Sequence, residues 1–505
     1  MKSIQTSVLL CALALVAGCR VGPDYRAPAV PLHRHWIQPA HYGINTNESP
    51  PVEWWTSLGD PVLDQLVLDS LSENLEARAA LARIGEARAL RGATRGEFFP
   101  KFFGVGNYDR RKISSNGTPF FTTTTNPFDS YQIGFDSSWE IDIWGKIRRS
   151  VEAANAELQI ASEDYFGVVL TLIAEVGRNY VDVRVAQTRL AIAESNRHIQ
   201  EQTLQMVESR HAAGLVSDLD VAQARENLFR TTATIPPLGV NLVTAKNALC
   251  VLRGLTPGAL DVVLDADGPI PDPSGSVAVG FPAELLRRRP DVRRAENTIV
   301  AENARIGVET ADLYPQFTLA GDIGVRTTDL ANLFTYESLE LNVGPAFRWN
   351  ILNFGRIRNR IAAQQQRREQ AVLKYQNTVL SAYREAENAL VAYDQTQQRR
   401  DALREAVSAA KQSVLLSGSQ YRRGLISFQT VLDSQRQLLE NEDQLALTAG
   451  NVSASYIALY KSLGGGWEVY PVALAHRAPL PSKMRHSPPT SPEAVPAPPP
   501  FSATK

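Results

Sequence analysis

The chain has 505 residues, and its 52 basic and 53 acidic side chains give a formal net charge of −1. This balance excludes a general electrostatic attraction to nucleic acid, which requires a basic surface. Apolar residues make up 44% of the chain, enough for a buried core, and 3 cysteines exclude a disulfide framework. No run of 18 or more uncharged apolar residues occurs, so no membrane-spanning helix is expected. The 30 prolines are absent from Phe128–Ile235 and Ala346–Tyr470, where long helices become possible.

Residues 1–18 are typical of a secretory signal, with Lys2 followed by the apolar run Val8–Val16. Small residues then precede Cys19, as in the lipobox of bacterial lipoproteins, so Cys19 is expected to become the lipidated first residue of the mature chain. The alternative is an ordinary signal peptide followed by a cysteine by chance. A single acylated cysteine is usually a reversible anchor, so a second membrane contact is expected elsewhere.

Three sequence landmarks occur twice, in the same order and about 210 residues apart. They are Phe99–Phe102 with Tyr314–Phe317, Trp139–Arg148 with Trp349–Arg358, and Gly214–Ser217 with Gly424–Ser427. The chain is therefore interpreted as a tandem duplication. Each copy is predicted to contain a helix, two strands, a very long helix, a glycine turn and a return helix.

The predicted helices follow the same plan in both copies. They are Leu63–Glu97, Lys146–Ala212 and Ser217–Leu252 in the first copy, and Ala283–Leu313, Arg356–Arg422 and Ser427–Leu463 in the second. A helix of about 67 residues is about 100 Å long, which is typical of a coiled coil or a helical tube. In each copy the first and return helices together match the long helix in length, so they are expected to stack end to end beside it.

Apolar residues recur every seven positions along the second long helix, which indicates a coiled-coil-like seam. The series is Val372, Val379, Ala386, Tyr393, Val407 and Val414, interrupted by Arg400 and supplemented by Tyr383 and Leu390. An ordinary helical bundle core is the alternative. The other faces are rich in Gln, Arg, Glu and Ala, which favours a thin-walled tube that is wet on both sides.

Between the helices lie runs in which apolar and polar residues alternate. Tyr131–Trp139, Phe317–Val325 and Leu339–Trp349 alternate clearly, and Phe102–Arg110 does so less cleanly. Such runs resemble outer-membrane barrel strands, although a soluble sheet with one wet face has the same alternation. Four strands cannot close a barrel, and open edges are not viable in lipid. Eight strands leave an interior filled by side chains, so three chains with twelve strands are expected.

Taken together, these landmarks resemble the TolC-type outer-membrane efflux proteins, in the lipoprotein branch that includes OprM-like and NodT-like channels. The resemblance covers about residues 19 to 467. It rests on both glycine turns and on Cys19–Pro28, Trp54-Trp55, Gly59–Pro61, Arg289–Val292 and Ala295-Glu296.

The resemblance implies a mainly α fold with membrane β structure. A homotrimer would place a 12-stranded β-barrel in the outer membrane and a long α-helical barrel across the periplasm. It would be a passive exit duct for drugs and toxic compounds. Its implied partners are outer-membrane lipid, a periplasmic adaptor and an inner-membrane pump, commonly of the RND class. No cofactor is implied beyond the covalent lipid on Cys19.

The expected domain organisation follows from these elements. It comprises a signal peptide (1–18), a lipid-anchored N-terminal segment (19–62), a first repeat (63–253), a linker (254–282), a second repeat (283–467) and a Pro-rich disordered tail (468–505).

The resemblance also implies a gate at the periplasmic tip. Asp433 matches an acidic ring that faces the lumen, and Asp220 with Tyr421 matches a hydrogen-bonded latch. A charged acceptor would strengthen such a bond. The family's latch arginine corresponds here to Ile426, and the hydrophobic constriction residue of the lipoprotein branch corresponds to Gln429.

These departures leave open how the closed state is held, with the nearby Arg422 and Arg423 as candidates. The alternative for both aspartates is that they are solvated carboxylates favoured at helix starts by the helix dipole. The tip turns are expected to contact the adaptor, through Gly214, Leu215, Ser217, Gly424, Leu425 and Ser427.

No enzyme motif is found: G-x-S-x-G, H-E-x-x-H, a Walker A loop and C-x-x-C are all missing from the sequence. Cys250, near the end of a predicted helix, is interpreted as a buried structural thiol. Two competing functions remain. One is a lipid-anchored coiled-coil scaffold or adhesin without a lumen, which needs no alternating strands. The other is a solute-specific porin, which the 100 Å helices disfavour.

Overall fold

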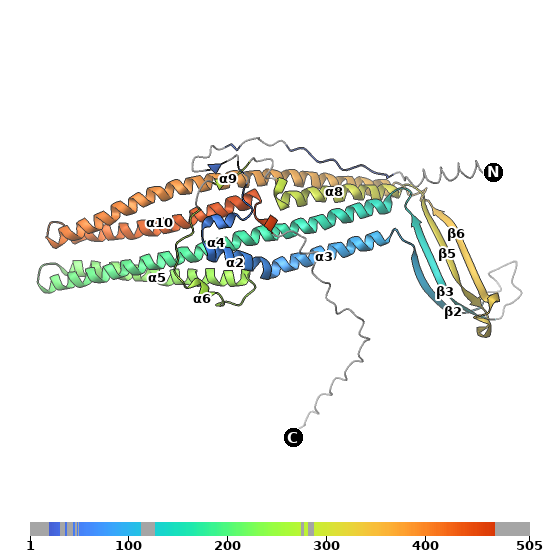
Figure 1. The fold of residues 1–505 in the computed structure, drawn as a ribbon, viewed down its shortest axis with the longest axis horizontal. Helices are drawn as coiled ribbons and strands as arrows, with labels where there is room; N and C mark the ends of the chain where they lie inside the picture. The colour runs from blue at the N-terminus through green and yellow to red at the C-terminus, as the bar shows by residue number, and fades with distance from the viewer. Residues whose placement is uncertain are drawn as a thin grey trace, which may run out of the picture. The chain divides into compact units, whose positions relative to one another are not determined.

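The computed structural model describes residues 20–30, 36–37, 44–45, 48, 50–112, 127–273, 277–280 and 287–469 (Figure 1). The predicted signal peptide, Cys19 and the tail from residue 470 lie outside the described residues. The longer helices are α2 (Pro61–Glu73), α3 (Leu75–Gly96), α4 (Lys146–Ala212), α5 (Asp218–Leu252), α8 (Pro290–Ala311), α9 (Arg356–Arg422) and α10 (Phe428–Leu463). The shorter ones are η1 (Trp54–Leu58), α6 (Asp261–Leu264), η2 (Leu330–Asn332), η3 (Tyr336–Ser338) and η4 (Trp467–Val469).

Both long helices have the predicted bounds, and each contains 67 residues. A left-handed glycine, Gly145 or Gly355, precedes each long helix. Asp142 caps α4 from outside it: its carboxylate accepts from the backbone N–H groups of Ile147 (2.9 Å) and Arg148 (3.1 Å). These N–H groups have no partner inside the helix, so the carboxylate satisfies them and interacts favourably with the helix dipole.

The predicted first helix Leu63–Glu97 is wrong as one element, because it breaks into α2 and α3 at Asn74. This residue is extended, with ψ 127°, and its side chain accepts from the backbone N–H of Ala77 (2.9 Å) to cap α3. Its amide group also donates to the carbonyl oxygen of Leu252 at the end of α5 (2.7 Å). One side chain therefore joins the start of α3 to the end of α5. The predicted end-to-end stacking of these helices beside α4 is confirmed.

In the second copy, the predicted helix Ala283–Leu313 is also wrong as one element, because it is interrupted at Arg289; its residues 283–286 lie outside the part of the chain that the structure describes. Arg289 is extended, and α8 begins at Pro290, where the missing N–H and fixed φ of proline suit a first helical residue. Arg289 is buried, donates to the carbonyl oxygen of Ser462 (2.8 Å) in α10 and contacts the Glu385 carboxylate (2.8 Å) in α9. It ties three helices together where α8 and α10 meet beside α9.

The predicted seam of α9 is confirmed. Val379, Ala386, Leu390, Tyr393 and Val407 are buried, and Val372, Tyr383 and Val414 are partly so. Arg400, which interrupts the series, pairs with Asp272 (2.7 Å) outside the helix. Cys250 is buried with a free thiol, as expected.

α5 differs from the expectation that no helix would suit a membrane. By length and composition it is apolar enough to cross a membrane. Only 28% of its most apolar stretch is buried within this chain, so most of that stretch needs another partner. It also stays helical through Pro236 and Pro237, which remove two backbone donors. Both prolines are exposed, and the whole helix packs along α4.

The two copies contribute to one antiparallel sheet of β2 (Lys101–Arg111), β3 (Phe128–Ile141), β5 (Gln316–Thr327) and β6 (Leu339–Arg348), in the order β2-β3-β5-β6. A small parallel pair, β1 (Ile44–Asn45) and β4 (Val277–Ala278), lies elsewhere. Gly134 and Gly324 face each other at the β3–β5 junction between the copies. A Cβ on Gly134 would lie 2.7 Å from the Gly324 Cα, so the strands approach too closely for a side chain.

Tryptophans join the sheet to the helices in the same way in both copies. The indole N–H of Trp139 donates to the carbonyl of Phe98 (2.9 Å), and that of Trp349 donates to Leu313 (3.0 Å). Trp144 similarly donates to Pro315 (2.9 Å). Since α3 and α8 end just before these acceptors, the bonds fix the strands against the helix ends.

Ion pairs line the contact between α4 and α8. Glu163 in α4 is 2% exposed and pairs with Arg293 of α8 at 2.8 Å. Its second oxygen, Oε2, is buried without a hydrogen-bond partner among the described residues. Burial therefore raises the pKa of Glu163 to about 7, although the Arg293 charge acts in the opposite direction.

Glu163→Gln should make the folded protein less sensitive to pH. The folded state binds the Glu163 proton more tightly than the unfolded chain does, because the pKa is raised from 4.5 to about 7. The stability from this group is complete below the unfolded pKa and is lost as pH rises toward 7. The variant should unfold at a higher temperature than the parent at pH 8 and at a similar temperature at pH 5, by thermal melts of purified protein. Glu157→Gln, at an exposed pair with Arg305, is the control. Equal pH dependence in the parent and Glu163→Gln would contradict this assignment.

Candidate functional site

The two glycine turns lie at the ends of the helical hairpins α4–α5 and α9–α10, away from the strands (Figure 1). Gly214 has φ +71° and Gly424 has φ +74°, the left-handed region that glycine adopts without strain. Neither glycine has a heavy atom within 4 Å of the position of a Cβ, so conformation, not space, selects glycine here.

Each turn ends one helix and starts the next. The N–H of Leu215 bonds to the carbonyl of Arg210 (2.9 Å), and the N–H of Leu425 bonds to Gln420 (3.0 Å). This is the Schellman pattern that satisfies the last helical carbonyls. Ser217 and Ser427 then occupy the N-cap positions of α5 and α10. The two leucines are 67% and 68% exposed, so each turn presents one apolar side chain to solvent.

Behind the turns, an apolar cluster joins the two hairpins. Its buried members are Val207, Ala224, Tyr421, Phe428, Val431 and Leu432, packed against Leu204, Met206, Val216, Val221 and Ile426. Ile426, which stands where the resemblance implied an arginine, packs against the apolar cluster at the tip.

The implied hydrogen bond between Asp220 and Tyr421 is not formed in the chain. The Tyr421 hydroxyl is buried without a hydrogen-bond partner among the described residues. Asp220 is instead part of a capping box: its carboxylate accepts from the backbone N–H of Ser217 (3.3 Å), and its own N–H bonds to the Ser217 hydroxyl (3.4 Å). Burial and the nearby Asp220 charge raise the pKa of Tyr421, so its hydroxyl stays protonated.

The cation beside Tyr421 is Arg210, which sequence reasoning missed when it considered Arg422 and Arg423. The Arg210 guanidinium lies 4.9 Å from the centre of the Tyr421 ring and donates to the carbonyl of Tyr421 (3.3 Å). It thus links the last turn of α4 to the end of α9. A basic residue in a helix's last turn, just before the glycine, was the available signal.

Asp433 and Gln429 lie one turn apart on the exposed face of α10. The Gln429 amide donates to the Asp433 carboxylate (2.8 Å), and Asp433 is 60% exposed. Arg436 approaches Asp433 only to 4.0 Å and makes its closer ion pair, 2.7 Å, with Glu226 of α5. The predicted acidic position is therefore open to solvent in a single chain.

Farther from the tip, Arg189 of α4 makes a two-point contact with Asp443 of α10, at 2.6 and 3.1 Å. A groove of about 580 Å³ adjoins this pair between α4, α5 and α10. Pro237 and Leu238 supply part of its apolar wall. This groove lies between the tip cluster and the region where α4 and α10 pack closely, for example where Gly450 of α10 lies against Val185 of α4.

Comparison with known proteins identifies the class that this fold defines. The family model described as outer membrane efflux protein matches residues 66–255 and 281–465. The chain belongs to this family of outer-membrane efflux proteins. It is an outer-membrane efflux channel and not an enzyme.

Individual relatives agree over nearly the whole chain. The solvent efflux pump outer membrane protein SrpC of Pseudomonas putida is 30% identical over 472 residues, which cover 92% of this chain and 98% of that protein. Nodulation protein T of Rhizobium leguminosarum bv. trifolii is 30% identical over 466 residues, covering 91% and 97%. Among solved structures, the outer-membrane channel OprN is 33% identical, with a TM-score of 0.83 over 89% of this chain and 100% of that one.

Arg210→Met should loosen the tip, because it removes the ring contact and the bond to the end of α9. We expect single-channel conductance in planar bilayers to rise several-fold. Tyr421→Phe keeps the ring and removes only the hydroxyl, which has no partner among the described residues, so its conductance should stay at the wild-type level. A rise for Tyr421→Phe that equals the rise for Arg210→Met would instead support the hydroxyl latch implied by the family resemblance.

Proposed function

We propose that three copies of this chain form a closed duct through the outer membrane, with a 12-stranded β-barrel and an α-helical barrel. The observation that supports this most directly is the four-stranded sheet. Within the described part of the chain, its outer strands β2 and β6 each pair on one side only. Unpaired backbone groups are costly in lipid, so each edge requires the edge of another copy.

The strand register supports membrane insertion of this sheet. Phe135 on β3 pairs with Ile323 on β5, which pairs with Leu341 on β6, so that apolar side chains form a row across three strands. These three side chains are 65%, 49% and 69% exposed. A row of exposed apolar side chains on one face suits contact with lipid.

The helices offer matching lateral surfaces. Apolar side chains of α5 and α9 remain exposed in the single chain: Phe229, Val240, Val243 and Val251 on α5, and Leu373, Leu380, Leu415 and Leu416 on α9. Contact between α5 of one copy and the tip half of α9 of the next would cover the exposed side chains of α5 together with Leu415 and Leu416. This would also account for the apolar composition of α5 without placing it in a membrane.

The proposed partners are a periplasmic adaptor and an inner-membrane pump, commonly of the RND class, that together deliver compounds to the duct. Leu215 and Leu425 are the proposed apolar contacts for the adaptor. Asp220, Tyr421, Asp433 and Gln429 are proposed to belong to the gate at the tip. Cys19 is proposed to carry a covalent lipid. The similar proteins are named for efflux of solvent, toluene or antibiotic, so the proposed cargo is drugs and toxic apolar compounds.

Cross-linking tests the trimer. A cysteine at Val105 of β2, combined with single cysteines placed along β6 from Leu339 to Arg348, should form a disulfide between copies only where the β6 position lies opposite Val105, because bridged Cα atoms lie within about 7 Å of each other. Denaturing gels without reductant should show a covalent trimer. The same β6 cysteines with a cysteine at Ile133 of the central strand β3 should give no such band. If the largest covalent product on these gels were a dimer, the proposed closure of the barrel by three copies would be contradicted.

Deletion of the gene tests the transport function. The deletion strain should become sensitive to organic solvents and apolar antibiotics, and the wild-type chain should restore growth. Retention of a fluorescent efflux substrate inside the cells should rise several-fold in the same strain. Unchanged sensitivity and retention across such a compound panel would argue against an efflux duct. A chain with charged substitutions at Leu215 and Leu425, present at normal levels in the outer membrane, should fail to restore growth.

A further inference from the structure

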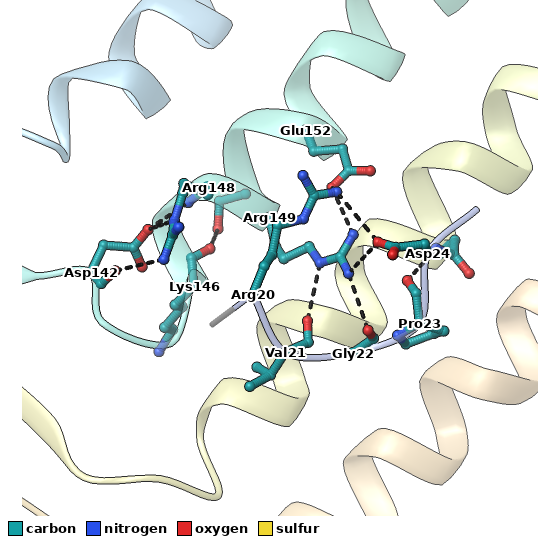
Figure 2. Close-up of polar contacts among 12 residues, drawn as sticks. Arg20, Val21, Gly22, Pro23, Asp24, Asp142, Lys146, Arg148, Arg149 and Glu152 are labelled. Carbon is teal, nitrogen blue, oxygen red and sulfur yellow. Dashed lines mark hydrogen bonds and ion pairs between the residues drawn. The ribbon is translucent and has the colours of Figure 1, made fainter. Parts of the chain in front are cut away.

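The segment Arg20–Asp24 lies along the start of α4, and Arg149 of α4 holds it (Figure 2). The Arg149 side chain is 0% exposed, although it carries a charge. Its Nε donates to the carbonyl of Val21 (3.1 Å), and one terminal nitrogen donates to the carbonyl of Gly22 (3.1 Å). A forked guanidinium is well suited to two adjacent carbonyls, and their bonds to it are stronger than neutral ones.

The charge of Arg149 is balanced on both sides of the contact. Asp24, on the segment, accepts at 3.0 Å, and Glu152, one turn along α4, accepts at 2.9 Å. Arg20 also pairs with Glu152. The segment thus supplies an acidic and a basic side chain to the same cluster. A buried guanidinium is tolerated only when such partners are present.

Three glycines allow the segment to approach this closely. Gly22 has φ +89°, and a Cβ on it would lie 2.6 Å from the Cα of Gly307 in α8. A Cβ on Gly307 would lie 2.7 Å from the Arg149 side chain, and one on Gly145 would lie 3.2 Å from that of Arg20. The contact therefore requires glycine at Gly307 of α8, at Gly145 before α4 and at Gly22 of the segment. This requirement indicates that the segment and its binding site have complementary shapes.

Further hydrogen bonds at Val21, Pro23 and Tyr25 extend the contact along the segment. The backbone N–H of Val21 donates to the carbonyl of Trp144 (3.2 Å), where β3 leads into α4. Asn303 of α8 donates to the carbonyl of Pro23 (2.8 Å), and Tyr25 donates to the Glu296 carboxylate (2.9 Å). The segment is held through its backbone at three successive residues, and the first of these bonds lies beside the strands.

We propose that Arg149 is the binding site for the chain's own N-terminal segment. We further propose that this contact between Arg149 and the segment, here named the clamp, couples the lipid anchor to the β-barrel. The second half of the proposal rests on the proposed lipidation of Cys19. Consecutive Cα atoms are about 3.8 Å apart, so a residue attached to Arg20 is tethered beside the strand–helix junction. A lipid held there enters the bilayer next to the barrel, and the two membrane contacts act as one bivalent anchor.

The clamp itself is tested by hydrogen exchange of the full-length purified channel. The Val21 amide, bonded to Trp144, should be protected in the wild type and should exchange at least tenfold faster in Arg149→Met and in Gly22→Ala. Arg149→Lys, which keeps the charge and loses the fork, should be intermediate. Arg305→Met, a control at the same α4–α8 contact whose arginine pairs with Glu157 and Glu302, should match the wild type. Gly22→Ala alters the segment rather than the helical core, so it remains informative if Arg149→Met fails to fold.

The readout separates positioning from general stability. Amides in the middle of α4 and the thermal midpoint should be the same in Gly22→Ala and the wild type. Faster Val21 exchange in Arg305→Met to the same extent, or wild-type exchange in both clamp variants, would overturn the clamp.

The coupling to lipid is tested by combining Arg149→Met with Cys19→Ser. With Cys19 present, Arg149→Met should lower the amount of trimer in the outer membrane several-fold. In the Cys19→Ser background, Arg149→Met should cause no further loss, because there is no lipid to position. Equal losses in both backgrounds would overturn the coupling. The mass of the N-terminal peptide reports acylation independently, so a failure of the lipidation proposal is distinguishable from a failure of the clamp.

Discussion

The fold depends on one packing requirement: each 67-residue helix must be covered along its whole length. A helix within a protein is stabilised mainly by the burial of one face, and a face this long exceeds the length of a single return helix. The chain covers α4 with α5 and α3, joined at Asn74 and Leu252. It covers α9 with α10 and α8, joined through Arg289. The break in each short helix is thus a consequence of the long one.

The same requirement determines where the polar groups gather. At the helix ends, free carbonyl and N–H groups need partners, and the chain supplies them with glycine turns, the Ser217 cap and the carboxylate of Asp142. Tryptophans satisfy carbonyls where helices meet strands. Arg210 does so at the tip, and Arg149 binds carbonyls of a separate segment at the opposite end of α4. Arginine recurs at these positions because one guanidinium group can donate to several carbonyl oxygens at once and remains charged where the chain is tightly packed.

The sheet and the tip share a second property, since both are incomplete in one chain. β2 and β6 have no partner on their outer sides among the described residues, and apolar rows of β3, β5 and β6 face outward. At the tip, Asp433 is exposed, and no described residue bonds to the Tyr421 hydroxyl. Both ends therefore present surfaces suited to further copies or partners, whereas the middle of the chain is well packed within itself.

The sequence by itself determined the duplicated plan, because proline-free stretches, glycine turns and alternating strands are local patterns. It predicted both long helices to their end residues and placed four strands correctly. It did not predict the breaks at Asn74 and Arg289, which arise because another helix ends beside them. It also missed Arg149 and Arg210, whose partners lie more than 100 residues away in the chain. Only the tertiary structure showed that Asp220 caps its own helix. The sequence allowed Asp220 to bond either to Ser217 nearby or to the distant Tyr421 hydroxyl, and only the positions of these groups in space show which bond forms.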